Sequence, residues 1–340
     1  MRSENPIEEL LESACPSIQY RIRQEILNEH LAADDLRGLQ ERILRDDLVR
    51  HVSESQSPDG WLGGRFHGYD SLEGGIRLLR EKGVCTDHPV LATALLALEM
   101  NTKRIAHEMG KAGAVLDEKG FGGTSMIRAS VFAVAEVENK PPVLEQIRVA
   151  LEGFRAVLTV KTIDSVVEPY KGQLVFKPGV KWPSLYHLRL LAYTRSWRSP
   201  DHLAMLVGAT ERLVKLSPLP YIHVRSNSQL IAPAAFGMQD FSPTMTSMNA
   251  AQWMMWFQRM ELLARLGVLG AITELRRQVN ILREMLSEEG GWFDQQITHE
   301  YFRRWGAYTG LMLEPDWRTP QRRIFDLTFR SLLIQHYSGM

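Results

Sequence analysis

The segment Gln56-Ser57-Pro58-Asp59-Gly60-Trp61 decides how the helical pattern around it is divided. An amphipathic pattern, with apolar residues three and four positions apart, ends at Ser55, and the next one begins at Ser71. A glycine after a helix can adopt the left-handed conformation, and the aromatic residue that follows can fold back over the helix end. The segment therefore predicts a junction between two helices.

Two further segments repeat this pattern of glycine followed by an aromatic residue. Residues 117–123 read Asp-Glu-Lys-Gly-Phe-Gly-Gly, and residues 287–293 read Ser-Glu-Glu-Gly-Gly-Trp-Phe. Each follows an amphipathic stretch, as the first segment does. Similar junctions at distant places indicate a fold that repeats one helical unit.

Apolar spacing predicts helices along nearly the whole chain, and these helices come in pairs. The pairs are 6–27 with 34–55, 71–81 with 89–108, 124–137 with 141–158, 184–194 with 199–216, 246–266 with 271–287, and 299–313 with 320–337. Pro16 should break the first helix, and Ser199-Pro200-Asp201 is a strong helix start. Strand signals are scarce, so the sequence predicts an all-α protein.

Two connections between the predicted helices are too long for tight turns. They cover residues 159–182 and 218–243 and contain polar residues, proline and glycine. Loops of this length often act as lids or binding surfaces, and the alternative is that they cover open ends of the core. No Ser-, Gly- or Pro-rich linker separates the two halves, so we expect one domain over residues 1–340.

The composition limits which partners and which cellular compartment we expect for this chain. Forty lysines and arginines balance forty acidic residues, so no net field attracts nucleic acid over long range. Cys15 and Cys85 are the only cysteines, which excludes a disulfide framework and a thiolate-rich metal site. Acidic residues near the start and the lack of about 20 consecutive apolar residues predict a cytoplasmic protein without a transmembrane segment. Peripheral membrane contact stays open.

The segment 56–61 resembles the repeat of squalene and hopene cyclases and related prenyltransferase folds, in which glutamine is followed by glycine and tryptophan. Val52 fits the aliphatic position before Gln56, whereas His51 stands where the family prefers an aromatic residue. The segment 16–21, followed by 56–61, is also similar to uncharacterised bacterial proteins of this repeat class. The resemblance implies a single α/α toroid of about six helical hairpins, with inner and outer helix rings around a central cavity.

The same resemblance implies a hydrophobic, isoprenoid-like ligand in that cavity and, if the chain is an enzyme, cyclase-like or transferase-like chemistry of a lyase or isomerase. The family's catalytic segments are missing, because neither Asp-x-Asp-Asp nor Asp-Asp-x-x-Asp occurs. Asp34-Asp35 and Asp46-Asp47 lie at helix starts or on outer faces, where capping or solvation explains them. Cys85-Thr86-Asp87-His88 lacks the spacing of the prenyltransferase zinc ligands, so we expect no metal and no cofactor.

Acidic, basic and cationic residues gather just after the first junction. They are Arg65, His67, Asp70 and Glu73, near the predicted helix start at residue 71. Asp70 or Glu73 is the candidate proton donor of a catalytic site that includes His67, because a buried carboxyl group favours its protonated form. Helix capping in a solvated turn is the alternative.

Aromatic and polar side chains on the predicted inner helices, and on the turns before them, are candidates for lining the cavity. They are Trp61, Arg65, Phe121, Arg128, Trp182, Tyr186, Arg189, Tyr193, Trp253, Trp256, Phe257, Trp292, Asp294, His299, Arg303, Trp305 and Tyr308. Residues 251–260 are apolar on nearly every face, and their rings could shelter an apolar or cationic ligand. Core packing, or a buried network of satisfied polar groups, is the alternative.

Three functions stay open. The leading hypothesis is a protein that binds, and as an enzyme transforms, a hydrophobic small molecule. The second is a non-catalytic interaction scaffold with a filled ring centre and an exposed apolar patch. The third is a carbohydrate-active enzyme, which needs paired carboxylates or a Tyr or His base with an arginine, for which His299, Tyr301 and Arg303 are candidates. The sequence does not indicate an oligomeric state.

Overall fold

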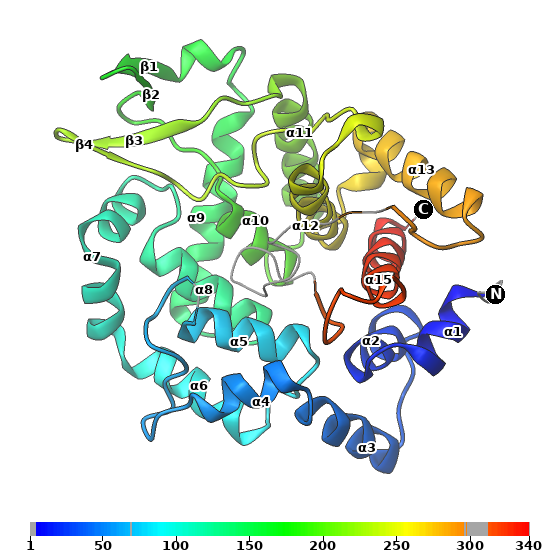
Figure 1. The fold of residues 1–340 in the computed structure, drawn as a ribbon. Coiled ribbons are helices and arrows are strands. Elements are labelled where there is room, and N and C mark those ends of the chain that lie inside the picture. Colours follow the sequence, from blue (N-terminus) through cyan, green and yellow to red (C-terminus); the bar gives the residue numbers. More distant parts are fainter. Residues whose placement is uncertain (1–4, 69, 296, 298–311, 340) are drawn as a thin grey trace. The chain divides into compact units, whose positions relative to one another are not determined.

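The computed structural model describes residues 5–68, 70–295, 297 and 312–339 (Figure 1). The chain divides into two compact units, each assembled from separate stretches of sequence. Unit 1 contains Met1–Asn101, Ser247–Glu261 and Gln278–Met340, and unit 2 contains Thr102–Thr246 and Leu262–Arg277. The expectation of one domain over residues 1–340 stays a prediction.

The described residues of unit 1 form helices and the turns between them. The helices are α1 (Pro6–Ser13), α2 (Pro16–Arg21), the π-helix η1 (Ile22–Ile26), α3 (Ala33–Leu44), α4 (Asp47–Glu54), α5 (Leu72–Glu81), α6 (Pro89–Met100) and α15 (Pro320–Ser338). Pro16 begins α2 and so interrupts the first predicted helix, as expected.

Unit 2 contains longer helices and all the strands that the structure describes. Its helices are α7 (Thr102–Glu118), α8 (Thr124–Val134), α9 (Pro141–Val157), the short η2 (Ile163–Ser165), α10 (Leu185–Ala192), α11 (Pro200–Leu216) and the short η4 (Leu269–Ala271). Three elements contain residues of both units: η3 (Met245–Ser247), α12 (Ala250–Leu266) and α13 (Thr273–Glu288).

Capping residues explain where helices begin. Ser199 Oγ accepts a hydrogen bond from the backbone N–H of His202 at 3.2 Å, which confirms the predicted start of α11. The Asp46 carboxylate accepts hydrogen bonds from the N–H groups of Leu48 and Val49. This cap starts α4, so the predicted helix over 34–55 is two helices.

Two other predicted helices differ from the structure. The predicted helix over 89–108 ends at Met100, and α7 begins at Thr102. The predicted helix over 299–313 lies outside the described residues except for its last two residues, which are not helical.

The prediction of an all-α protein is wrong in unit 2. The chain is mostly helical but also contains a four-stranded mixed sheet. Its strands are β1 (Val167–Tyr170), β2 (Gln173–Phe176), β3 (Ile222–Ser226) and β4 (Gln229–Ile231). They lie within the two long connections for which the sequence predicts loops.

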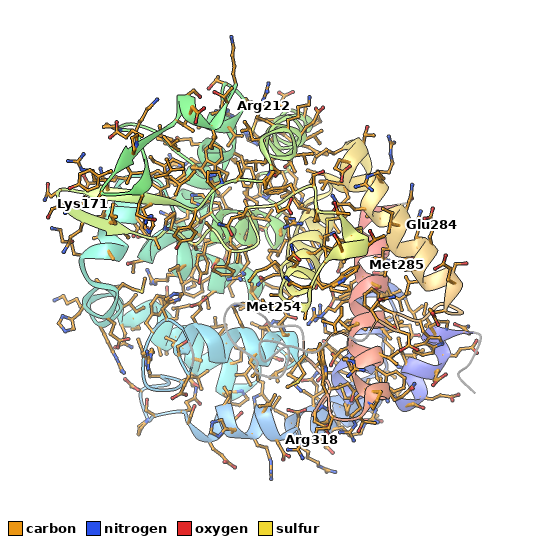
Figure 2. The ribbon with its side chains drawn as sticks, turned by 45° about the horizontal axis from the view of Figure 1, so that its top comes forward. Lys171, Arg212, Met254, Glu284, Met285 and Arg318 are labelled. Carbon is orange, nitrogen blue, oxygen red and sulfur yellow. The ribbon has the colours of Figure 1, made fainter. Side chains whose placement is uncertain are left out.

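The sheet joins two hairpins side by side. β1 and β2 are antiparallel, as are β3 and β4, and β2 runs parallel to β3 with Leu174 opposite Ile222. The first hairpin turns at Lys171 (labelled in Figure 2) and Gly172, both with positive φ, as tight two-residue turns require. Strands of three to five residues give too little alternation to stand out in a sequence.

The glycine–aromatic junctions have the predicted backbone and burial. The glycines have left-handed φ angles, which are 84° at Gly60, 74° at Gly120 and 64° at Gly290. The aromatic residues of the junctions, Trp61, Phe121 and Trp292, are buried. At the first junction, the Gln56 amide nitrogen donates to the carbonyl oxygens of Gly60 (3.1 Å) and Val90 (2.8 Å), which ties the junction to the first turn of α6.

No described helix combines the length and the apolar character that crossing a membrane requires.

A network of charged side chains lies buried in unit 1. Arg21 pairs with Glu25 at 2.5 Å and with Glu81 at 2.8 Å. Arg330 pairs with Glu81 at 3.1 Å and with Glu261 at 2.9 Å. These side chains come from α2, η1, α5, α12 and α15. Because taking each ion out of water costs several kcal/mol, removing one partner of this network should leave a costly unpaired charge.

Replacing one arginine of this network tests its importance. Arg330→Met should lower the free energy of unfolding by about 3–5 kcal/mol, because Glu81 and Glu261 then stay buried without this cation. Urea denaturation measures the loss. The control is Arg37→Met, which removes an exposed ion pair to Asp34 of 3.2 Å and should change stability by less than about 1 kcal/mol. Equal losses in the two variants would contradict the interpretation.

A second pair of variants tests the first junction. A Cβ atom on Gly60 would lie 2.4 Å from the backbone oxygen of Thr93, and the backbone there has a φ of 84°. Gly60→Ala should therefore destabilise by about 1–3 kcal/mol. Gly38→Ala in α3, where no atom lies within 4 Å of a new Cβ, should stabilise by about 0.5–1 kcal/mol. Thermal unfolding measures both effects: the midpoint temperature should fall in Gly60→Ala and rise in Gly38→Ala.

Candidate functional site

The loop that leads into α5 brings two of the predicted catalytic residues together. It folds back on itself through positive φ angles at Gly63 (65°), Gly68 (97°) and Asp70 (50°). A backbone hydrogen bond of 3.0 Å from Glu73 N–H to the Phe66 carbonyl holds the loop against the helix start. The loop thereby places His67 next to Glu73.

Glu73 and His67 are hydrogen-bonded through Glu73 Oε2 and His67 Nδ1. The Glu73 side chain is 0% exposed and the His67 side chain 25% exposed. Glu73 lies in the first turn of α5, where the helix dipole stabilises a negative charge. A carboxylate at this position orients the imidazole and makes Nε2 the ring nitrogen through which His67 would exchange protons.

The other two residues predicted near this pair lie at the surface. Asp70 and Arg65 are both exposed, and the Asp70 carbonyl accepts a hydrogen bond from Gly64 N–H at 3.1 Å. Of the two carboxylates considered as proton donors, Glu73 is the buried one and Asp70 belongs to the turn.

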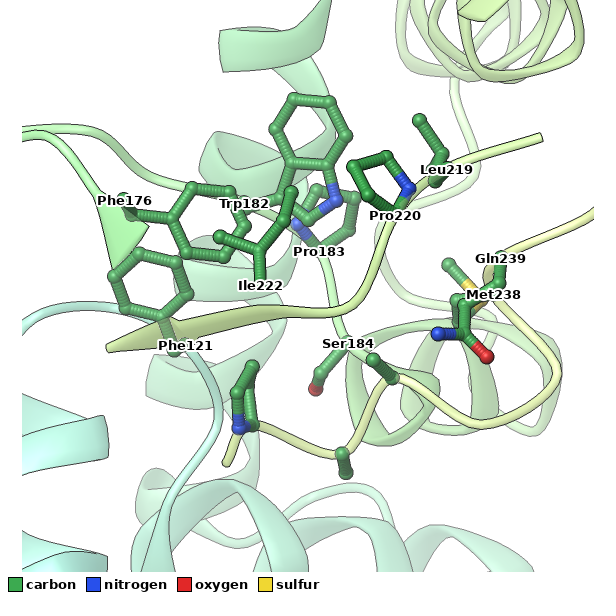
Figure 3. A pocket seen from close by; sticks show the side chains of 13 residues that line it. Phe121, Phe176, Trp182, Pro183, Ser184, Leu219, Pro220, Ile222, Met238 and Gln239 are labelled. Carbon is green, nitrogen blue, oxygen red and sulfur yellow. The ribbon is translucent and has the colours of Figure 1, made fainter. Parts of the chain in front are cut away.

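A small pocket lies in unit 2, where the two long connections pack against the start of α10 (Figure 3). Its walls are aromatic rings and prolines together with small or aliphatic side chains: Phe121, Phe176, Trp182, Pro183, Leu219, Pro220, Ile222, Pro233, Ala234, Ala235 and Met238. Ser184 and Gln239 are the polar lining residues, and no lining residue is charged. A cavity volume of about 20 Å³ leaves room for one or two waters or a small alkyl group.

The aromatic wall of this pocket is continuous. Ring centroids are 4.7 Å apart between Phe121 and Phe176 and 5.7 Å apart between Phe176 and Trp182. The second connection closes the pocket, and the Leu185 N–H anchors it by donating to the Ala234 carbonyl at 2.9 Å. Phe121 and Trp182 are therefore the predicted cavity residues that line a pocket.

Ser184, at the floor of the pocket, is joined to His187. Ser184 Oγ lies 2.7 Å from His187 Nδ1, which also accepts the Ser184 backbone N–H at 3.0 Å. Burial lowers the pKa of His187 to about 3, so the ring is neutral near pH 7. A base this weak cannot activate a serine hydroxyl, and the pair instead caps the N-terminus of α10.

The aromatic residues of α12 form a packed cluster. Trp253, Trp256 and Phe257 meet each other with centroids 5.2–5.8 Å apart, and Phe293 contacts Trp253 and Phe257 at 5.3 and 5.1 Å. Trp256 Nε1 donates to Gln278 Oε1 at 2.8 Å. These contacts favour core packing over a ligand cage at this position.

Most other predicted cavity residues also contact the protein itself. Cations lie over aromatic rings, with Arg128 over Phe132 at 5.6 Å, Arg189 over Tyr186 at 5.0 Å and Arg265 over Tyr193 at 5.0 Å. Trp292 packs on Phe325 in an apolar cluster with α1 and α2, and Asp294 is half-buried. His299, Arg303, Trp305 and Tyr308 lie outside the described residues.

Sequence patterns missed most of the pocket. Phe176, Leu219, Ile222 and Met238 were not candidates, although the long connections that carry them were candidates for binding surfaces. The proline and aromatic residues concentrated in those connections were the available signal. Among the residues that the structure describes, no three His, Cys, Asp or Glu side chains gather as a metal site would require.

The pH dependence of stability tests the role of His187. Its pKa is lower in the folded than in the unfolded state, so the unfolded state binds more protons between about pH 3 and 6.5. Stability should therefore rise with pH in that window, by up to about 1.4 kcal/mol per pH unit. His187→Gln, which keeps a cap acceptor, should remove this contribution, whereas exposed His107→Gln should not. Urea denaturation at several pH values measures the slope, and an unchanged slope in His187→Gln would refute the assignment.

Comparison of the chain with protein families, with curated proteins and with solved structures finds no match. The resemblance to the cyclase repeat therefore stays a prediction. Two places in the described part of the chain bear on function, the His67–Glu73 pair and the apolar pocket.

Proposed function

We propose that this chain is an α/α toroid of the squalene-cyclase and prenyltransferase class that binds a hydrophobic, isoprenoid-like small molecule and does not cyclise it. The observation that carries the proposal is the pocket of unit 2, whose lining combines three aromatic rings with prolines and no charged residue. The toroid part is supported by the paired helices and by the glycine–aromatic junctions. At the first junction, the Gln56 side chain is hydrogen-bonded to the carbonyl oxygens of Gly60 and Val90 and so joins the junction to the next helix.

The pocket suits the branched end of an apolar molecule better than a polar substrate. Ligand sites are commonly apolar with a few placed polar groups, and here the Ser184 hydroxyl is one such group. A charged ligand would lose its hydration without gaining a counter-charge among the lining residues. The small volume accommodates one end of such a molecule.

The His67–Glu73 pair argues against cyclisation. Protonating an alkene requires a strong acid kept neutral in apolar surroundings. Glu73 instead shares a hydrogen bond with the His67 imidazole at a helix N-terminus, so it does not stand alone in apolar surroundings.

A non-catalytic scaffold is the second candidate, and two observations favour it. The rings of Trp253, Trp256 and Phe257 are packed against one another, as a filled interior would require. Leu96 and Met100, one turn apart on α6, are 57% and 72% exposed and supply the apolar patch that a scaffold needs. The candidates for the carbohydrate hypothesis, His299, Tyr301 and Arg303, lie outside the described residues.

Binding of farnesol, an isoprenoid alcohol, tests the proposal. Calorimetric titration should show farnesol binding to the purified chain more tightly than unbranched dodecanol. Ala235→Leu should weaken farnesol binding at least tenfold, about 1.4 kcal/mol, because the larger side chain fills the pocket. Ala112→Leu places the same side chain on an exposed site of α7 and should leave binding unchanged.

The outcomes separate the two candidate functions. Equal weak binding of both alcohols, unaffected by Ala235→Leu, would contradict the ligand proposal and leave the scaffold. Gas chromatography coupled to mass spectrometry separates farnesol from isomeric products, and a cyclic product would contradict the claim that the chain does not cyclise its ligand.

A further inference from the structure

A cluster of buried ionisable groups holds the segment 312–317, which leads into α15. The Asp326 carboxylate on α15 accepts three hydrogen bonds from this segment. The donors are the N–H groups of Leu313 (2.8 Å) and Glu314 (3.0 Å) and the indole Nε1–H of Trp317 (2.6 Å). Asp326 is fully buried, so these donors replace the water it loses on folding.

The same segment is joined to the C-terminal end of α5. Lys82, the C-cap of α5, donates from Nζ to the Leu313 carbonyl at 2.5 Å and pairs with the Asp46 carboxylate at 2.7 Å. The Lys82 side chain is fully buried. Lys82 thus links α5, the start of α4 and the segment 312–317 through one ammonium group.

Glu314 joins the segment to the start of α2. Its Oε1 accepts a hydrogen bond of 2.7 Å from the backbone N–H of Cys15, the N-cap of α2. The Cys15 thiol donates to the Leu313 carbonyl at 3.4 Å. Glu314 is buried, and this contact needs only one of its two oxygens as an acceptor, so a protonated Glu314 can make it.

The charges around Glu314 oppose its ionisation. Burial and the neighbouring Asp326 raise its pKa to about 7, against weaker opposing effects of the hydrogen bond from the Cys15 N–H, of Arg322 and of Lys82. Burial also raises the pKa of Asp326 to about 6, with the hydrogen bonds from Trp317, Leu313 and Glu314 and the charge of Arg330 acting in the opposite direction. Burial likewise raises the pKa of the Cys15 thiol, which therefore stays neutral. Above neutral pH, an ionised Glu314 therefore lies beside the Asp326 carboxylate.

We propose that the segment 312–317 is a pH-operated latch, closed when Glu314 is protonated and opened when Glu314 ionises beside Asp326. The step is a single proton leaving the Glu314 carboxyl group for water. Opening releases the start of α15 from α2 and from the end of α5, without requiring unit 1 to unfold. The latch is independent of the proposed ligand pocket, which lies in unit 2.

The direction of the effect follows from linkage. The pKa of Glu314 is about 4.5 when it is exposed in the open segment and about 7 in the closed one. The closed state is therefore favoured most below pH 4.5, and this advantage is lost as the pH rises to about 7. Between pH 6 and pH 8 the opening equilibrium should increase about tenfold.

Hydrogen exchange read by mass spectrometry measures this opening directly. In the wild-type chain, amides of a peptide covering 312–317 should lose about tenfold in protection between pH 6 and pH 8, after correction for the intrinsic exchange rate. Glu314→Gln keeps the acceptor for Cys15 and cannot ionise, so its protection should not change over this range. Exposed Glu12→Gln, near the same end of unit 1, should behave as the wild type does.

A second variant keeps the test decisive if Glu314→Gln folds poorly. Arg322 is part-exposed, pairs with Asp316 at 2.7 Å and favours ionisation of Glu314. Arg322→Gln should therefore move the midpoint of opening to higher pH. Constant protection of the wild type between pH 6 and 8, an unchanged slope in Glu314→Gln, or a midpoint that stays in place in Arg322→Gln would each overturn the latch.

Discussion

The buried ion network of unit 1 is the interaction on which that part of the structure depends. Arg21 and Arg330 come from opposite ends of the chain, and their carboxylate partners include Glu81 and Glu261 from helices between them. An apolar core of this size would tolerate small shifts of its helices, because hydrophobic contacts have no direction. Buried ions do not tolerate such shifts, since each misplaced partner leaves a charge without compensation. The network therefore fixes which helices meet in unit 1.

Unit 2 is organised differently, around short apolar and capping contacts. His187 stays neutral because it is buried, and it caps α10 together with Ser184. The turn that carries Phe121 fits closely against this cap. At Gly122 in this turn, a Cβ atom would lie only 2.6 Å from Ser184 Oγ, so only glycine fits without a shift. The same cap residue forms part of the pocket lining. The second glycine–aromatic junction thus shapes the pocket as well as ending a helix.

Sequence patterns predicted those parts of the fold that are determined by neighbouring residues. The glycine φ angles, the cap at Ser199 and the break at Pro16 depend on a few adjacent residues, and the structure agrees with each. The sheet escaped prediction because its short strands are stabilised by pairing between connections that lie far apart in sequence, such as Leu174 with Ile222. No local pattern reports such a partner.

The candidate acids show the same difference between positions determined by nearby residues and positions determined by residues far away in sequence. The proximity of His67 and Glu73 was predictable, because they are only six positions apart in sequence, at the junction of one loop with α5. No local pattern singles out Glu314, because its segment is buried through contacts with residues more than 200 positions away: Glu314 binds the Cys15 N–H, and the Leu313 carbonyl binds Lys82.

Burial alone does not make a carboxyl group a catalytic acid, as these residues illustrate. Glu73 is fully buried, but it shares a hydrogen bond with an imidazole and lies at a helix N-terminus rather than alone in apolar surroundings. Glu314 is also buried and favours the neutral form, but its contacts are with backbone groups and ionisable neighbours rather than with an apolar pocket. Cyclase chemistry needs the neutral acid and the apolar chamber in one place. The acids named here belong to unit 1 and the apolar pocket to unit 2, so neither unit by itself combines the two among its described residues.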